Sequence, residues 1–543
     1  MSITPPGVSS KDFSDALKQF EETVGKEWVF TSDEDVALYR DAYSPFWGEP
    51  EERVASAAVA PYTVEQVQAV MKTANEYKIP VYPISTGKNL GYGGSAPNLS
   101  GSVVLDLKRM NRILNVDERD ASALVEPGVS YFDLYRHIQD RKLKLWVDVP
   151  DPGWGSPVGN SLDHGGGYLQ PMYRNHFDSH CGMEVVLANG EVMRTGMGAM
   201  PGAQSWQQYK FGFGPWIDGM FSQSNFGVVT KMGFWLMPEP DAYLTGTVSV
   251  PRYEDLIPMI DILTLLENSG ISNGMPGLGS PILGGFMMPQ RAPEVTAMLQ
   301  KDGVESPELH KYAQDKGIPF WSCTVKFYGP EKAIRAQWEY AQEKFSAIAG
   351  AKFKDDEFYK FPLTPDQFNK VHKPEMGIPS LEMFSIGARS PYNPTPGQGH
   401  IWFSPIIPRT GEAVLEANKV FAKAAKDFGL PLLSFSLPTT YWMRSFIFLF
   451  GFPITHDVAT NKKNRETFKQ VVKVAAEHGW GEYRTAPAFQ DAVMDTYSFN
   501  NHALRRFHET VKDAVDPNGI ISAGRYGIWP KHLRGNKPGG EKA

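Results

Sequence analysis

Residues 83–94 combine the residue types that can bind an anion. The glycines of this segment let backbone N–H groups approach a phosphate closely, its Ser and Thr hydroxyls add donors, and Lys88 adds a positive charge. The segment matches neither G-x-G-x-x-G nor G-x-x-x-x-G-K-[ST], so neither nucleotide-binding signature is satisfied. Two further glycine-bearing segments, 125–129 and 155–160, favour a large cofactor touched by several loops over a set of ordinary tight turns.

His176 and His180 lie four residues apart, which superficially resembles a zinc-binding pair on a helix. The acidic residue between them, Asp178, is not placed like the Glu of H-E-x-x-H, and the sequence offers no obvious third ligand. We therefore expect no metal and interpret both histidines as loop or packing residues.

Residues 270–274 fit G-x-S-x-G, the motif that carries the nucleophile of many serine hydrolases. That motif needs an apolar strand before the serine and a helix after it. Here residues 263–267 have a helical pattern, and Met275-Pro276-Gly277 blocks a following helix. We interpret the match as coincidence.

The elements that would position these loops alternate between helix and strand. Thr63 and Gln66 form a capping-box pattern before an apolar stripe that runs to residue 74, which predicts a helix. Asn189-Gly190 between two apolar runs predicts a hairpin. Because strands are also predicted at 81–84, 103–107, 123–126 and 225–237, helix and strand are mixed in one domain.

The residue pattern of the sequence changes after Pro238. Helical patterns at 253–266, 330–348 and 411–428 alternate with Pro-rich loops, and the chain returns to short turns near its end. We place a boundary near residue 240 and divide the chain into residues 1–240, 241–480 and 481–543, the last with a tail rich in Gly, Pro and Lys.

Composition narrows the class of protein. A chain of 543 residues with 42% hydrophobic and 21% charged residues is an ordinary globular protein of two to four domains. Its formal net charge of −7 and the absence of a long basic stretch argue against nucleic acid as a partner. Two cysteines argue against a disulfide framework, and no apolar run reaches the ~20 residues of a membrane span. We expect a cytoplasmic protein with no membrane partner.

Long strings throughout the chain carry a family resemblance. They include ISTGKNLGYGGSAP, DVPDPGWGSPVGN, GHIWFSP, HGWGEYRT and AVDPNGIISAGRYGIW. Through them the chain resembles, over residues 6–529, the vanillyl-alcohol oxidase and p-cresol methylhydroxylase family of flavoproteins. The resemblance is greatest to members that oxidise para-substituted phenols such as vanillyl alcohol and eugenol.

The resemblance implies an α+β fold with FAD as cofactor. Residues 1–240 and 481–543 would form a two-part FAD-binding domain, and residues 241–480 an inserted α+β cap domain over the substrate. His400 matches the histidine that bonds covalently to the flavin 8α-methyl carbon, and such a bond makes the flavin a stronger hydride acceptor. The other residues implied to line the cofactor are Ser85, Thr86, Gly87, Lys88, Asn89, Gly91, Pro150, Gly159, Asn160, Val229 and Arg525.

The resemblance also implies roles in catalysis. A para-substituted phenol gives up a benzylic hydride more readily as its phenolate, because the ring can then form a quinone methide. Tyr92, Tyr483 and Arg484 match the family's phenolate-binding residues and would lower the pKa of the bound phenol. Asp151 matches the carboxylate near flavin N5 that activates water or deprotonates the product. The remaining residues expected in the substrate pocket are Tyr168, Trp402, Trp442 and Phe446.

Departures from the family pattern bear on the substrate and on the flavin bond. Residues 441–447 are more apolar and aromatic here than in relatives, which leads to the hypothesis of a bulkier or less polar para-substituent. Residues 43–52 contain no histidine to match one that promotes flavin attachment in some relatives.

The electron acceptor is left open by the sequence. We expect reoxidation by O2 with formation of H2O2, because His400 stands where the cytochrome-linked branch has a tyrosine. The alternatives are a cytochrome-linked phenol dehydrogenase or hydroxylase of the same family, and a flavin-binding protein without catalytic activity. The expected partners are a phenolic small molecule and further copies of the chain, as a homodimer or larger homo-oligomer.

Overall fold

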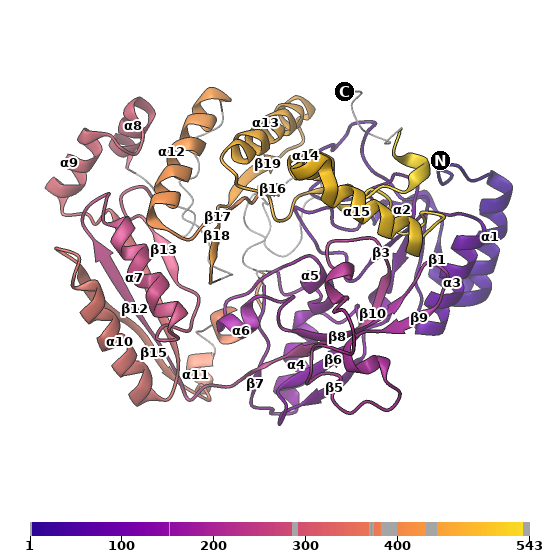
Figure 1. Ribbon diagram of the computed structural model, residues 1–543, viewed down its shortest axis with the longest axis horizontal. Helices are drawn as coiled ribbons and strands as arrows, with labels where there is room; N and C mark the ends of the chain where they lie inside the picture. The colour runs from indigo at the N-terminus through magenta and orange to yellow at the C-terminus, as the bar shows by residue number, and fades with distance from the viewer. Residues whose placement is uncertain are drawn as a thin grey trace.

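The structure is a computed structural model that describes residues 3–150, 152–284, 292–368, 371, 374–381, 399–429 and 443–535. Figure 1 shows two lobes side by side. The N-terminal residues, indigo to magenta, and the yellow C-terminal helices form one lobe, and the pink and orange elements form the other. Within the described ranges, no helix has both the length and the apolar character needed to cross a membrane.

The first sheet of the N-terminal lobe has the strand order β1-β2-β4-β3. Its strands are β1 (Val29–Phe30), β2 (Ala57–Val59), β3 (Val81–Ile84) and β4 (Val103–Asp106), and both β2 and β3 run parallel to β4. Helices α1 (Ser10–Val24) and α3 (Val64–Glu76) share a hydrophobic core with these strands, and the short α2 (Asp33–Ala37) follows β1. The predicted helix start is confirmed, because Thr63 Oγ1 accepts a hydrogen bond from Gln66 N at 3.3 Å.

The second sheet is antiparallel, with the order β5-β6-β10-β8-β9. Its strands are β5 (Ile113–Asp117), β6 (Ser122–Val125), β8 (His180–Val186), β9 (Val192–Arg194) and β10 (Val228–Trp235). The hairpin predicted at Asn189-Gly190 is the β8–β9 turn, where Gly190 takes a φ of 80°. Helix α4 (Tyr131–Asp140) packs on this sheet. The short helices α5 (Pro157–Leu162) and α6 (Pro171–Arg174) come after α4 in the chain. Strand β7 (Leu145–Trp146) pairs with β11 (Met237–Pro238) in a separate two-stranded ribbon.

The C-terminal segment returns to the first sheet. Ile521 forms a parallel bridge with Val81 of β3, so strand pairing joins residues 440 positions apart (521 − 81). Helices α14 (Gln490–Thr496) and α15 (Phe499–Val515) precede this bridge. The fully buried Lys512 of α15 anchors it, because its ammonium donates to Asp516 Oδ2 at 2.7 Å and to the Ile521 carbonyl at 2.7 Å.

The second lobe is built on an antiparallel sheet with the order β13-β14-β12-β15. Its strands are β12 (Ala242–Val250), β13 (Gly277–Gly279), β14 (Trp321–Gly329) and β15 (Lys352–Lys360). Helices α7 (Leu256–Asn268) and α10 (Glu331–Phe345) bury their apolar faces in the same core as this sheet. The predictions of helices at 253–266 and 330–348 are confirmed by α7 and α10.

The rest of the second lobe consists of helices and two short ribbons. The helices are α8 (Pro293–Asp302), α9 (Pro307–Lys316), α11 (Pro365–Phe368), α12 (Gly411–Asp427) and α13 (Val458–Glu477). One ribbon pairs β16 (Gly399–Phe403) with β19 (Phe450–Ile454), and the other pairs β17 (Ile406–Pro408) with β18 (Ser445–Ile447). These ribbons lead the chain back towards the N-terminal lobe (Figure 1).

The G-x-S-x-G match has no catalytic geometry. Ser272 is fully buried and its hydroxyl donates to the Lys326 carbonyl at 3.3 Å, while Gly274 N donates to the same carbonyl at 3.0 Å. The segment therefore packs on β14 after the end of α7, as expected for a coincidental match.

Candidate active site

A cavity of about 710 Å³ is lined by both lobes and brings together most of the predicted site residues. Its wall combines the loop after β3, residues of the 150–168 segment, strand β10, strand β16 and the C-terminal segment. The predicted residues that line it are Ser85, Thr86, Gly87, Lys88, Asn89, Tyr92, Pro150, Gly159, Asn160, Tyr168, Val229, His400, Trp402, Tyr483, Arg484 and Arg525.

The loop after β3 is folded tightly around its glycines. Gly87 has a φ of 67°, and a Cβ at this position would lie 2.2 Å from Ser95 Oγ, so a larger residue would clash. Asn89 O accepts backbone hydrogen bonds from Tyr92 and Gly94, both at 3.0 Å, which closes the following turn. This turn places the side chains of residues 85–89 on the wall of the cavity.

Gly91 is not among the residues that line the cavity. Its φ is 81°, and a Cβ there would lie 3.1 Å from the His400 carbonyl. The structure therefore gives Gly91 a different place from the expected phosphate contact: it lets the loop pack against the backbone of β16.

The 148–176 region is ordered by one buried acid and one buried histidine. Asp148 Oδ1 accepts backbone hydrogen bonds from Tyr168 at 2.9 Å and Leu169 at 2.7 Å, and its other oxygen pairs with His176 Nε2 at 2.7 Å. His176 Nδ1 contacts the side-chain oxygen of Asn160. The network thus fixes two cavity residues, Asn160 and Tyr168.

The two histidines of the H-x-x-x-H spacing belong to different networks. His180 at the start of β8 pairs with the buried Asp218 at 3.0 Å, whereas His176 pairs with Asp148. Among the residues that the structure describes, no group of three or more His, Cys, Asp or Glu side chains is arranged to hold a metal ion.

His400 reaches the cavity because of the alternation of β16. His400 and Trp402 lie on the same face of this strand, with ring centroids 4.5 Å apart, while Ile401 and Phe403 between and beyond them belong to the core of the second lobe. The Tyr43 ring lies 5.4 Å from the His400 ring. The histidine is 9% exposed and is held between two aromatic side chains at the cavity wall.

Arg484 places a buried positive charge beside two tyrosines. Its guanidinium carbon lies 3.8 Å from the Tyr92 ring centroid and 5.5 Å from the Tyr483 ring centroid, and its Nη1 donates to the Asp163 carbonyl at 3.3 Å. Burial by itself would lower the pKa of this guanidinium, but the neighbouring Tyr483 and Tyr92 oxygens and the Asp163 carboxylate hold the pKa well above its usual value. Arg484 is therefore a permanent cation.

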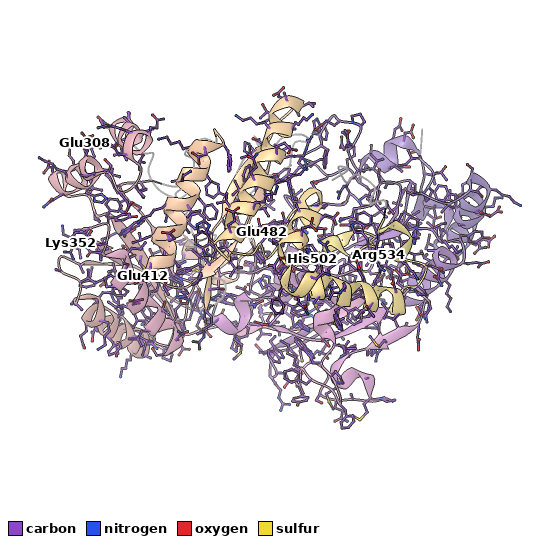
Figure 2. All side chains as sticks on the ribbon, turned by 45° about the horizontal axis from the view of Figure 1, so that its top comes forward. Glu308, Lys352, Glu412, Glu482, His502 and Arg534 are labelled. Atoms are coloured by element: carbon purple, nitrogen blue, oxygen red, sulfur yellow. The ribbon has the colours of Figure 1, made fainter. Side chains whose placement is uncertain are left out.

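Residues 482–485 lie where the second lobe meets the C-terminal helices, and Figure 2 labels Glu482 at the centre of the molecule. Both Glu482 carboxyl oxygens accept from Ser404 N at 2.9 Å. The Ser404 hydroxyl lies 3.4 Å from the Tyr92 hydroxyl. Burial raises the pKa of Glu482 well above its usual value.

Asp163 is a cavity residue that the sequence analysis missed. Its carboxylate accepts hydrogen bonds from Asn89 Nδ2 at 2.6 Å, from Arg525 Nη2 at 2.9 Å and from the Tyr526 hydroxyl. These partners lie 74, 362 and 363 residues away in the chain, so no local pattern could have indicated them. Burial by itself would raise the pKa of Asp163, but the Arg525 and Arg484 guanidiniums hold it below its usual value.

Three further predicted site residues remain, of which the structure describes only Phe446. Asp151 and Trp442 lie outside the described residues. Phe446 is fully buried in the core of the second lobe, because β18 pairs with β17 and turns this side chain away from the cavity. The expectation that Phe446 lines the substrate pocket is therefore not met.

The side chains of this cavity fit FAD and an aromatic anion. Gly159 gives a close approach of backbone, since a Cβ there would lie 2.2 Å from Ser85 Oγ, and the adjoining hydroxyls and Lys88 suit a pyrophosphate. Arg484 with Tyr92 and Tyr483 supplies a cation and two phenolic hydroxyls in a partly apolar wall, which suits a phenolate.

Comparisons with known proteins agree with this chemistry. Residues 55–196 match a family model described as FAD binding domain. The chain is 33% identical, over 97% of its length and 98% of the relative, to the flavoprotein subunit of 4-cresol dehydrogenase [hydroxylating] from Pseudomonas putida. It is also 28% identical, over 87% of its length and 91% of the relative, to 1'-carboxy-chondrochloren decarboxylase from Chondromyces crocatus.

Two solved structures match the chain over nearly its whole length. A 4-ethylphenol oxidase from Gulosibacter chungangensis in complex with isoeugenol is 34% identical, with a TM-score of 0.82 over 98% of this chain and 100% of that chain. A p-cresol methylhydroxylase with bound substrate is 31% identical, with a TM-score of 0.82 over 97% of this chain and 99% of that chain. The predicted α+β FAD-binding fold and the predicted FAD cofactor are confirmed by these matches.

Proposed function

Because this chain belongs to the vanillyl-alcohol oxidase and p-cresol methylhydroxylase family of FAD-dependent phenol-oxidising enzymes, we propose that it removes a hydride from the benzylic carbon of a para-substituted phenol and that O2 accepts the electrons. The proposed substrates are 4-hydroxybenzylic alcohols and 4-alkyl- or 4-allylphenols. The observation that carries the proposal is the buried Arg484 guanidinium, 3.8 Å from the Tyr92 ring centroid in the wall of the FAD cavity.

The proposed cofactor contacts follow the lining of the cavity. When bound, FAD supplies the hydride acceptor. Ser85, Thr86, Lys88 and Asn89 would hold the pyrophosphate through hydroxyl, amide and ammonium donors. The residues that would line the rest of the cofactor are Gly87, Pro150, Gly159, Asn160, Val229 and Arg525. His400 is the proposed site of the covalent bond to the flavin 8α-methyl carbon, and its place at the cavity wall supports this role.

The proposed role of Arg484, Tyr92 and Tyr483 is to bind the substrate as its phenolate. A cation and two phenolic hydroxyl donors in a partly dry cavity stabilise an oxygen anion more strongly than water does. Loss of a hydride from the benzylic carbon of that phenolate leaves a neutral quinone methide, because the oxygen electron pair moves into the ring. Asp151 is the proposed group that activates water or deprotonates the product.

The para-substituent is proposed to lie against aromatic side chains. Trp402 and Tyr168 line the cavity and support a pocket for an alkyl or allyl group. Phe446 lies in the core of the second lobe instead, so the proposal of a bulky substituent depends on Trp402 and Tyr168. Steady-state rates over a panel of phenols with para-substituents from methyl to propenyl test the preference, and equal rates across the panel would contradict it.

The proposed reaction has a direct test. Anaerobic addition of 4-ethylphenol to the FAD-loaded protein is expected to bleach the flavin absorbance, and air is expected to restore it within milliseconds to a second. No bleaching with any para-substituted phenol would contradict the proposed function.

A second candidate differs in the electron acceptor. It is favoured by the 33% identity to the flavoprotein subunit of a 4-cresol dehydrogenase, a name that implies a further subunit. Stopped-flow mixing of the substrate-reduced protein with air-saturated buffer separates the candidates, because reoxidation that takes many seconds would favour a protein acceptor over O2.

A further inference from the structure

Asp163 is surrounded by donors from three separate parts of the chain. Its Oδ2 accepts from Asn89 in the loop after β3, and its Oδ1 accepts from Arg525 and from the Tyr526 hydroxyl in the C-terminal segment. Arg484 Nη1 lies 3.9 Å from Oδ2. The Asp163 side chain is 7% exposed, and the Arg484 and Arg525 side chains are each 13% exposed.

This arrangement makes two guanidiniums share one carboxylate. The Asp163 carboxylate lies 2.9 Å from Arg525 Nη2 and 3.9 Å from Arg484 Nη1. Buried charge of one sign is costly unless an opposite charge is supplied. The Asp163 charge therefore offsets part of the positive field of the two guanidiniums, and its removal would make the adjoining cavity more favourable to an anion.

Further titratable groups face this cluster. His164 lies next in the chain, and burial lowers its pKa, which keeps the imidazole neutral. Tyr82 of β3 accepts from Arg525 Nη1 at 3.3 Å, and burial raises its pKa, which keeps its hydroxyl protonated. Arg53 is a further cation near Tyr82, and the carboxyls of Asp41 and Asp491 raise the pKa of its guanidinium against the effect of burial.

We propose that Asp163 is a positioning residue that holds Arg484 and Arg525 together and weakens the positive field that these two guanidiniums exert on the bound phenol. The inference deepens the proposed function and rests on it, because it assumes that the phenol oxygen binds at Arg484. The hydrogen bonds from Asn89, Arg525 and Tyr526 occupy both Asp163 oxygens, so this residue acts through the two guanidiniums rather than on the substrate.

Two variants separate the charge of Asp163 from its hydrogen bonds. Asp163→Asn removes the charge, but its oxygen can still accept from Arg525 and Tyr526, and Asn89 can present its own oxygen after rotation of its amide. Asp163→Ala removes the same charge and also all three acceptor contacts. Any difference between the two variants therefore measures positioning.

The probe is 4-fluorophenol, which has no benzylic hydrogen and cannot be oxidised by hydride loss. The ¹⁹F chemical shift of the bound probe reports whether it is a phenol or a phenolate, independently of turnover and of flavin absorbance. A pH titration of the holoenzyme complex then gives the pKa of the bound probe. The matched control is Asp106→Asn, which neutralises another buried carboxylate of the N-terminal lobe that does not line the cavity.

The expected result is a fall in the pKa of bound 4-fluorophenol by about one unit or more in Asp163→Asn. At ~7 Å and in an effective dielectric of about 20, the Asp163 carboxylate would lower the ionisation constant of the bound phenol by more than a factor of ten. Asp106→Asn is expected to leave this pKa unchanged. In Asp163→Ala we expect the phenolate to bind at least about tenfold more weakly than in Asp163→Asn, because Arg525 and Tyr526 lose their shared acceptor.

Each contrary outcome has a distinct meaning. An unchanged pKa in Asp163→Asn, with wild-type protein binding the probe as an anion, would overturn the inference and leave the proposed function standing. Equal affinities in the Asn and Ala variants would refute the positioning role. Failure of the wild-type holoenzyme to bind 4-fluorophenol as an anion would overturn both the inference and the proposed function.

Discussion

Replacement of Arg484 by alanine tests the electrostatic core of the proposed reaction. A phenolate oxygen about 4 Å from the guanidinium gains roughly 4 kcal/mol in an effective dielectric of about 20. Loss of one donor at an oxyanion site costs a similar ~3–4 kcal/mol, which corresponds to a few hundredfold in rate. We therefore expect the limiting rate of flavin reduction by 4-ethylphenol at pH 7.5 to fall by a few hundredfold in Arg484→Ala.

The pH dependence of that rate separates a lost charge from a damaged fold. If Arg484 binds the phenolate as proposed, the phenol bound to the wild type is ionised near neutral pH, and the limiting rate at saturating substrate should change little above pH 7. In Arg484→Ala the bound phenol should ionise near the pKa of about 10 of an ordinary phenol, and the limiting rate should rise about tenfold per pH unit towards that value.

The assay is anaerobic stopped-flow absorbance of the flavin, with Arg484→Lys as the matched control. Lysine keeps the charge but loses the planar fork, so an intermediate loss of about tenfold is expected. A limiting rate within threefold of wild type in Arg484→Ala, or the same pH profile in both proteins, would refute the assignment of the phenolate to Arg484.

Three further predictions follow from other residues. Acid-precipitated wild-type protein should keep its yellow colour, whereas His400→Ala should release FAD into the supernatant; a colourless wild-type pellet would contradict the covalent bond. Gly159→Ala should reduce the FAD content of purified protein, because its Cβ would lie 2.2 Å from Ser85 Oγ. Since Ser85→Gly removes a proposed pyrophosphate donor, the double variant should regain only the FAD content of Ser85→Gly alone, and a double variant below that level would contradict the clash. Burial raises the pKa of Asp41 from 3.8 to about 6, so the folded state binds this proton more tightly and stability should decline by about 3 kcal/mol as pH rises from about 4 to 6. Asp41→Asn should lack this part of the decline in thermal unfolding at pH 4 to 7, and parallel curves for the two proteins would contradict it.

Local patterns predicted many elements of the fold. The α3 helix follows from Thr63, Gln66 and the apolar stripe behind them, and the β8–β9 hairpin follows from Asn189-Gly190, because caps and tight turns are determined by neighbouring residues. The sheet of the second lobe was not predicted from local sequence patterns. Strand β15, with the sequence KFKDDEFYK, has no apolar alternation that marks a strand, and it forms because β12 offers a pairing edge.

Some residues of the site could likewise be predicted from local patterns, whereas others depend on contacts between distant parts of the chain. The loop at residues 85–89 could be identified from its glycines and donors, and the family strings indicated His400 and Arg484. Asp163 could not be found, because its role depends on Asn89, Arg525 and Tyr526, which only the folded chain brings together. The side on which β18 presents Phe446 was equally out of reach, since it depends on the pairing of β18 with β17.

The bridge between Ile521 and Val81 has a consequence for biosynthesis. The edge of the first sheet is completed, and Arg525 is delivered to the cavity, only after residues 521–525 have left the ribosome. A nascent chain that stops before residue 520 already contains the glycine-rich loop but lacks its closing strand partner and one of the two guanidiniums. We therefore expect stable capture of FAD to follow synthesis of this segment, so supply of FAD at earlier stages of translation should not alter the yield of loaded enzyme as long as FAD is present afterwards.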